Sequence, residues 1–236
     1  FASVRVAYPQ GAQKGSLITR FQFMPYGVNS CSLTPQPGYF DVVINAHAVP
    51  NGKPSSFYEE FKMKNNLYGY GFNDTENLKP ETSYFHKMFA RDLQAVRYFK
   101  DNEFGNGKYV FQGMSQGGMQ ACIMAAHTDG LATQVNLTVP WFCDVGATKT
   151  LGRMSGWRPN DMPGIHYFDT AIAAKYIDKK CMVSIEAGLG DYICPPSGIM
   201  AMYNEMTCTK SIQFVQNRTH EYVPSEQVKS TQFKRV

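Results

Sequence analysis

Several features that would assign this chain of 236 residues to a particular class of protein are missing from it. It has no apolar run of the ~18–20 residues needed to span a bilayer, so no membrane-spanning segment is expected. Basic residues are not gathered into a stripe and the net charge is only +4, so a nucleic-acid partner is not indicated. Internal repeats and low-complexity tracts are also absent. What is left is one compact domain that binds or acts on something small.

The six cysteines show neither CxxC pairs nor zinc-finger spacing. Neither a structural metal site nor a disulfide framework is therefore indicated, although the even number permits disulfides. Cys122 falls in a segment with the character of a buried helix, and we expect it to be a free, buried thiol.

Six short segments of apolar and β-branched residues have the character of β-strands. Several of them are apolar along most of their length, which is typical of strands covered on both faces. Because these strands alternate with helical segments, the sequence predicts an α/β fold, a three-layer sandwich with a mostly parallel sheet. The expected strands are Ser16–Phe23, Phe40–Asn45, Lys108–Gln112, Gln134–Val139, Met182–Ala187 and Ile212–Asn217.

The clearest helix is expected from about Ser83 to Lys100, where apolar residues recur every three or four positions behind a capping serine. Pro50–Pro80 and Cys143–His166 break the alternation. We predict a long surface loop in the first and a lid-like insertion in the second, because long structured loops in compact domains are often functional. The alternative is an insertion without a functional role. Further helices are expected at Gln116–His127, Ala171–Tyr176, Ser197–Glu205 and near the C-terminus.

The segment from Gly113 to Gly117 reads G-M-S-Q-G and matches the G-x-S-x-G pattern of serine hydrolases. The pattern alone is weak, but here it follows an expected strand directly and precedes an expected helix. Such an elbow holds the serine in a strained turn with its hydroxyl exposed above the sheet edge. Ser115 is therefore the predicted nucleophile.

A serine nucleophile needs a histidine base and an acid that orients the histidine. In this topology the acid and then the base follow the serine, each just after a later strand. Asp191 and His220 meet both conditions. Asp144 and Asp169 are rival acids, but Asp144 follows too early a strand and Asp169 is expected to cap a helix that starts near Thr170.

Four segments match motifs that occur together in one hydrolase family. The elbow resembles a GGSQGG motif, and Val139–Asp144 resembles V-P-x-x-C-D. Gly188–Pro196 is similar to G-x-x-D-x-x-C-P-P, which supplies the acid, and His220 with Glu221 is similar to the H-E pair that supplies the base. With these motifs the chain resembles the acetyl xylan esterase / cephalosporin C deacetylase family of α/β-hydrolases, in its Bacteroidetes-type version.

The resemblance implies that the backbone N–H groups of Tyr26 and Gln116 form the oxyanion hole. Two segments depart from the family pattern: Phe23–Val28 stands in place of H-G-x-G, and Asn45-Ala46-His47 in place of R-G-Q. The family also has strands before the oxyanion strand, for which only Ser3–Tyr8 is available here. We therefore expect the chain to be the C-terminal, catalytic part of a longer protein.

The resemblance further implies a serine carboxylesterase that removes acetyl groups from plant polysaccharide or its oligosaccharides through an acyl-enzyme, without a cofactor or metal. The expected partner is an acetylated carbohydrate and the expected setting is secreted or periplasmic; the sequence leaves a homo-oligomer open. Trp141, Trp157 and His47 are candidate substrate contacts, with core packing as the alternative. Two other functions are considered: a feruloyl-type esterase or other hydrolase of the same fold, and a catalytically decayed carbohydrate-binding module.

Overall fold

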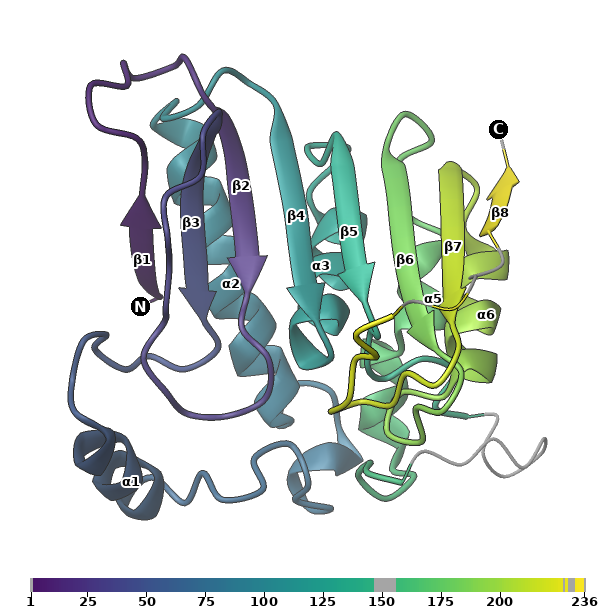
Figure 1. Cartoon of the computed structure of the whole chain (residues 1–236). Helices are drawn as coiled ribbons and strands as arrows, with labels where there is room; N and C mark the ends of the chain where they lie inside the picture. The colour runs from purple at the N-terminus through teal and green to yellow at the C-terminus, as the bar shows by residue number, and fades with distance from the viewer. Residues whose placement is uncertain (1, 147–155, 227, 229–231, 236) are drawn as a thin grey trace.

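The computed structural model describes residues 2–146, 156–226, 228 and 232–235. Its centre is an eight-stranded sheet in the order β1-β3-β2-β4-β5-β6-β7-β8 (Figure 1). Strands β2 to β7 run parallel, whereas the edge strands β1 and β8 are antiparallel to their neighbours. The predicted α/β class with a mostly parallel sheet is confirmed. The strands are β1 Ser3–Ala7, β2 Ile18–Phe23, β3 Tyr39–Asn45, β4 Tyr109–Met114, β5 Gln134–Thr138, β6 Met182–Gly188, β7 Thr209–Val215 and β8 Gln232–Arg235.

The helices begin and end close to the predicted positions. Ser83 caps the long helix α2 by accepting the backbone N–H of Phe85 at 3.4 Å. The prediction of a helix near the C-terminus is wrong, because residues 232–235 pair with β7 and extend the sheet by one strand. The helices are α1 Ser55–Lys64, α2 Tyr84–Asp101, α3 Gln116–His127, α5 Thr170–Ala174 and α6 Pro196–Glu205, with 3₁₀ turns η1 Glu76–Leu78 and η2 Pro163–Phe168.

One face of the sheet carries the core. Helices α2, α3, α5 and α6 lie behind the sheet in Figure 1, whereas α1 lies below it. Burial alternates along β5, where Val135 and Leu137 are buried while Gln134, Asn136 and Thr138 are not. Strands β2 and β6 alternate in the same way over most of their length. The described helices α2, α3, α5 and α6 thus lie on one side of the sheet. The expectation of strands covered on both faces is met by β3, which is buried at every position after Tyr39, but not by the strands whose burial alternates.

The segment Pro50–Pro80 is not the surface loop that its composition predicts. It contains α1 and η1, and the side chains of Tyr58, Leu67, Tyr70 and Asn77 are buried. Aromatic residues make this possible, since they bury a large area even where the backbone is irregular. The segment therefore contributes to the core below the sheet edge.

The lid-like insertion predicted for 143–166 falls largely on residues 147–155, which lie outside the described residues. All six cysteines are free, and Cys122 is buried within α3 as expected. Among the described residues, no helix combines the length and the apolar character that crossing a membrane would take.

Candidate active site

The residues predicted to be catalytic follow three parallel strands at the same edge of the sheet. Ser115 follows β4, Asp191 lies just beyond β6, and His220 lies in the loop after β7. The predicted oxyanion residue Tyr26 follows β2. Because β2, β4, β6 and β7 are parallel, their C-terminal ends meet at one edge, the lower edge in Figure 1.

Ser115 occupies the strained turn that the elbow motif predicts. Its backbone has φ 55° and ψ −120°, a conformation that non-glycine residues rarely adopt. Its N–H donates to the Thr138 carbonyl at 3.0 Å, and its own carbonyl accepts the Trp141 N–H at 3.0 Å. These bonds tie the turn to the end of β5. The side chain is 4% exposed, so the hydroxyl is more enclosed than the predicted open position above the sheet edge.

The glycines of the elbow are required by close approach of the backbone. A Cβ atom at Gly113 would collide with the backbone of Gly117, and one at Gly117 would collide with the Phe23 carbonyl. A Cβ at Gly118 would lie 2.9 Å from Cα of Pro140. The start of α3 therefore packs directly against β4 and against the end of β2, which leads into the predicted oxyanion segment.

Asp191 and His220 form the predicted acid–base pair. Oδ2 of Asp191 lies 2.9 Å from Nδ1 of His220, and Oδ1 accepts the backbone N–H groups of Ile193 at 2.9 Å and Cys194 at 2.8 Å. The carboxylate is buried and fixed by three partners. With Nδ1–H donated to Asp191, the His220 Nε2 atom is unprotonated and can accept a proton from a serine.

The loop that carries His220 is attached to the loop that carries Asp191. The Arg218 carbonyl accepts the N–H of Gly190 at 3.0 Å, and the Val215 carbonyl accepts that of Leu189 at 3.0 Å. The Arg218 guanidinium is buried and pairs with the Glu186 carboxylate on β6. This pair fixes the backbone two residues before His220.

Cys194 connects the serine with the acid–base pair. Its thiol lies close to the Ser115 side chain. The Cys194 sulfur and ligand atoms of Asp191 and His220 all lie within 4.8 Å of one another. Burial raises the pKa of this thiol well above its usual value, which keeps it protonated in this structure. The side chains of Cys194, Asp191 and His220 therefore form one cluster, in which Cys194 also donates its backbone N–H to the Asp191 carboxylate.

The rival acids have other partners. Asp169 caps α5 by accepting the Ala171 N–H at 2.8 Å, as predicted, and it also accepts the N–H groups of Asp144 and Val145. Asp144 itself has a positive φ of 61° in the turn after β5. Asp191 is the acid whose carboxylate contacts His220, so the structure favours it over both rivals.

Three other histidines lie away from this cluster. His86 is exposed on α2, and His127 contacts the Ile123 carbonyl at the end of α3. His166 pairs with Asp161 at 2.6 Å. His220 is thus the histidine that contacts Asp191 at the sheet edge where Ser115 lies.

The two predicted oxyanion donors are brought to the same region. Gln116 is the first residue of α3, where a backbone N–H has no acceptor within the helix and the helix dipole favours negative charge. The chain from Phe23 to Met24 packs on Gly117, which places Tyr26 on the adjoining loop. The Tyr26 ring stacks on Tyr70 with centroids 4.3 Å apart.

The predicted substrate contacts divide into two groups. Trp141 and His47 are each 1% exposed, so neither ring is accessible to a sugar in this structure. The prediction that they contact substrate is therefore wrong, and both are core residues. The Trp141 indole donates to the Trp157 carbonyl at 3.0 Å. Trp157 is half-buried and makes an edge contact with the Tyr26 ring at 4.3 Å. Trp157 therefore remains a candidate for the substrate side.

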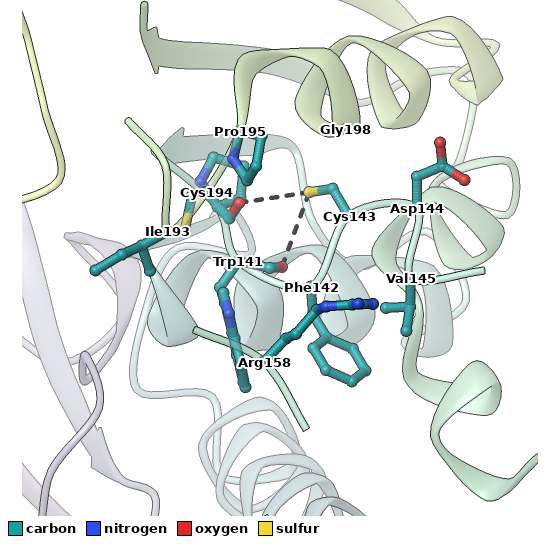
Figure 2. A pocket seen from close by; sticks show the side chains of 11 residues that line it. Trp141, Phe142, Cys143, Asp144, Val145, Arg158, Ile193, Cys194, Pro195 and Gly198 are labelled. Atoms are coloured by element: carbon teal, nitrogen blue, oxygen red, sulfur yellow. Dashed lines mark hydrogen bonds between the residues drawn. The ribbon is translucent and has the colours of Figure 1, made fainter. Parts of the chain in front are cut away.

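A small cavity of about 30 Å³ lies beside Cys194. Figure 2 shows that Ile193, Cys194 and Pro195 line one side of it and the turn after β5 lines the other. Arg158 extends along the cavity past Phe142. The cavity thus lies between the loop that fixes Asp191 and the turn that fixes the Ser115 backbone.

Sequence reasoning missed Tyr70 and Cys194 as members of the site. Tyr70 lies in the segment interpreted as a surface loop, where only the density of tyrosine and glycine in Tyr68–Phe72 marks the position as unusual. Cys194 lies inside the motif that supplies Asp191, and its contact with Ser115 depends on the fold.

A family model described as acetyl xylan esterase (AXE1) matches residues 159–236. This range contains the Gly188–Pro196 motif and His220, so the family resemblance is confirmed over this part of the chain. The match indicates a carboxylic ester hydrolase. None of the curated protein sequences compared with the chain matches it.

Solved structures similar to this one include two acetyl xylan esterases. The enzyme from Paenibacillus sp. R4 has a TM-score of 0.70 at 18% identity and covers 94% of this chain and 75% of that chain. Acetyl xylan esterase 1 from Thermoanaerobacterium sp. JW/SL YS485 has a TM-score of 0.72 at 18% identity, and the match covers 95% of this chain and 75% of that chain. Est1E from Butyrivibrio proteoclasticus, bound to ferulic acid, has a TM-score of 0.58 at 14% identity, and the match covers 94% of this chain and 88% of that chain. These similarities establish the α/β-hydrolase fold.

Proposed function

We propose that this chain, a relative of the acetyl xylan esterases, is a serine carboxylesterase that removes acetyl groups from plant polysaccharide or its oligosaccharides. The observation that carries the proposal is the contact of the buried Asp191 carboxylate with His220, at the same sheet edge at which Ser115 occupies a strained strand–helix turn. A decayed site has no reason to retain all three residues in this arrangement. A carbohydrate-binding module without activity is therefore the weaker alternative.

The proposed reaction proceeds in two halves. His220 Nε2 takes the proton of Ser115 as Oγ attacks the ester carbonyl, and Asp191 stabilises the imidazolium that forms. The oxyanion accepts hydrogen bonds from the backbone N–H groups of Tyr26 and Gln116; one such donor contributes about 3–4 kcal/mol in the transition state. The imidazolium then protonates the leaving sugar oxygen, and a water molecule repeats the cycle on the acetyl-enzyme.

Two features support a small acyl group and a sugar as leaving group. The 4% exposure of Ser115 leaves little open space for a bulky acyl chain beside the nucleophile. On the outer side, Tyr192 is 63% exposed directly after Asp191, and Tyr222 is 55% exposed two residues after His220. Exposed aromatic rings at the rim of a site are suited to stacking on sugar rings.

The test is hydrolysis of 4-nitrophenyl acetate, butyrate and octanoate by the wild type and by Ser115→Ala. We expect the acetate ester to be the best substrate and its turnover to be lost in the variant. A second assay compares release of acetate from acetylated xylo-oligosaccharides with hydrolysis of methyl ferulate. Faster hydrolysis of the ferulate would favour a feruloyl esterase, and no serine-dependent turnover of any ester would refute the proposal.

A further inference from the structure

We infer that Tyr70, with His47, is a positioning residue that holds the two backbone donors of the oxyanion hole in register with each other. The inference rests on the proposed function and concerns residues from two segments that are distant in sequence. Tyr70 comes from the segment between α1 and η1, and His47 follows β3. Neither residue touches the reacting atoms in the proposed mechanism.

One phenol oxygen joins the two loops that carry the donors. The Tyr70 hydroxyl accepts the backbone N–H of Gly27 at 3.0 Å and donates to Oε1 of Gln116 at 2.8 Å. Gly27 is the neighbour of Tyr26, and Gln116 carries the other donor. The hydroxyl therefore fixes the distance between the β2 loop and the start of α3. Burial raises the pKa of this phenol, which keeps it protonated and able to donate.

His47 holds the same glycine from the other side. Its Nε2 atom lies 3.2 Å from the Gly27 carbonyl, so Nε2 carries the proton and donates. Its Nδ1 atom then accepts the hydroxyl of Tyr84, which lies at 2.5 Å. Burial lowers the pKa of His47 to about 4, so the ring is neutral at the pH of an esterase assay. The N–H and the carbonyl of Gly27 are thus held by two different buried side chains.

The backbone and the rings reinforce this arrangement. Gly27 has φ +132°, and a Cβ atom there would lie 2.8 Å from the Asn29 amide nitrogen, so glycine is needed. The Tyr26 ring stacks on the Tyr70 ring at 4.3 Å, and the His47 ring meets the Tyr70 ring edge-on at 4.6 Å. A change at Tyr70 is therefore transmitted to the peptide whose N–H faces the oxyanion.

Tyr70→Phe removes the bridging oxygen and leaves the stacked ring in place. Loss of an oxyanion donor lowers kcat by about 10²–10³-fold. A donor that is displaced but still present should lower kcat by a smaller factor. We expect kcat on 4-nitrophenyl acetate to fall about 10–100-fold with KM changed by less than about twofold. A KM-only effect would overturn the inference, because it would place Tyr70 in ground-state binding.

Tyr58→Phe is the matched control. Tyr58 lies in the same segment, is 3% exposed against 5% for Tyr70, and its hydroxyl also accepts one backbone N–H and donates to one acceptor. Its partners, Lys53 and Pro50, lie outside the site. We expect the two variants to lose similar stability but only Tyr70→Phe to lose kcat. Equal losses of kcat in both variants would refute a positioning role.

Hydrogen exchange tests the inference without relying on turnover. We expect Tyr70→Phe to speed amide exchange in peptides that cover 24–28 and 116–119, and Tyr58→Phe to leave these peptides unchanged. If the wild type hydrolyses no ester, the proposed function fails, but faster exchange at both loops still supports the bridge. Unchanged exchange at both loops overturns the inference whatever the activity.

Discussion

Replacing Asp191 by asparagine tests the orientation of the acid–base pair. In the structure the carboxylate accepts His220 through Oδ2 and two backbone N–H groups through Oδ1. An asparagine at this position keeps the two backbone bonds if its oxygen replaces Oδ1. Its NH₂ group then faces Nδ1 of His220 and can only donate. The imidazole is forced into the tautomer with the proton on Nε2, which cannot accept the proton of Ser115.

The magnitude follows from this change of tautomer. A serine triad whose acid is replaced by asparagine loses about 10⁴ in kcat, which corresponds to about 5.4 kcal/mol of transition-state stabilisation. Because two of the three hydrogen bonds survive, we expect the free energy of unfolding to fall by no more than about 1–2 kcal/mol. The expected result is a folded protein that binds substrate and barely turns it over.

The assay is steady-state hydrolysis of 4-nitrophenyl acetate, with urea unfolding of the same preparations. Asp144→Asn is the control, because Asp144 is a rival acid that follows the neighbouring strand β5. We expect this control to retain kcat within about tenfold of the wild type. A loss of less than tenfold in Asp191→Asn, or a loss of about 10⁴ in Asp144→Asn, would refute the assignment of the acid.

Three further predictions concern packing and pH. Gly117→Ala places a methyl group against the Phe23 carbonyl, so we expect a loss of about 1–3 kcal/mol in urea unfolding together with a lower kcat; unchanged values would contradict the close approach. Trp141→Ala removes a buried ring, and we expect a loss of about 3–5 kcal/mol and a lower Tm, whereas an effect on KM alone would restore Trp141 as a substrate contact. Burial raises the pKa of Asp92 to about 8 from an ordinary value of 3.8, so the unfolded chain releases this proton first as pH rises. The free energy of unfolding should therefore fall between about pH 4 and pH 8, and unfolding of Asp92→Asn over that range should show a flatter profile.

The candidate catalytic residues could be selected from the sequence because each one is tied to a local pattern. Ser115 stands between a strand and a helix with glycines on both sides, and Asp191 and His220 each follow a later strand of a parallel sheet. The topology of such a sheet brings these positions to one edge whatever the details of packing. Order along the chain was therefore enough to select Asp191 over Asp144 and Asp169.

The surroundings of the site could not be predicted in the same way. The contact of Tyr70 with Gly27 and Gln116 joins residues more than 40 positions apart, and it depends on where an irregular segment folds back. Trp141 and His47 contact the backbone of Ser115 and Gly27, respectively, but the sequence does not say which way a ring points. Burial of a side chain is decided by its neighbours in space.

The packing of helices on one side of several strands could have been predicted from the polar and apolar pattern within each strand. The segment Gln134–Thr138 alternates polar and apolar residues, which is the pattern of a strand with one face in the core. The expectation of two covered faces rested instead on the apolar content of several strands taken together. The final strand was missed because four residues carry too little periodicity to separate a strand from a short helix.

The one-sided packing of β5, β6 and β7 sets how freely these strands can change in sequence. Asn136, Ser184 and Ser211 point away from the core side of their strands, and none of them is fully buried. Substitution of one polar residue for another at such positions usually changes stability by less than about 0.5 kcal/mol. Val135 and Ile185, on the core side, are held by packing. Random mutagenesis followed by selection for folded protein should therefore accept changes at every second residue of these strands, so that tolerance itself has the period of a β-strand.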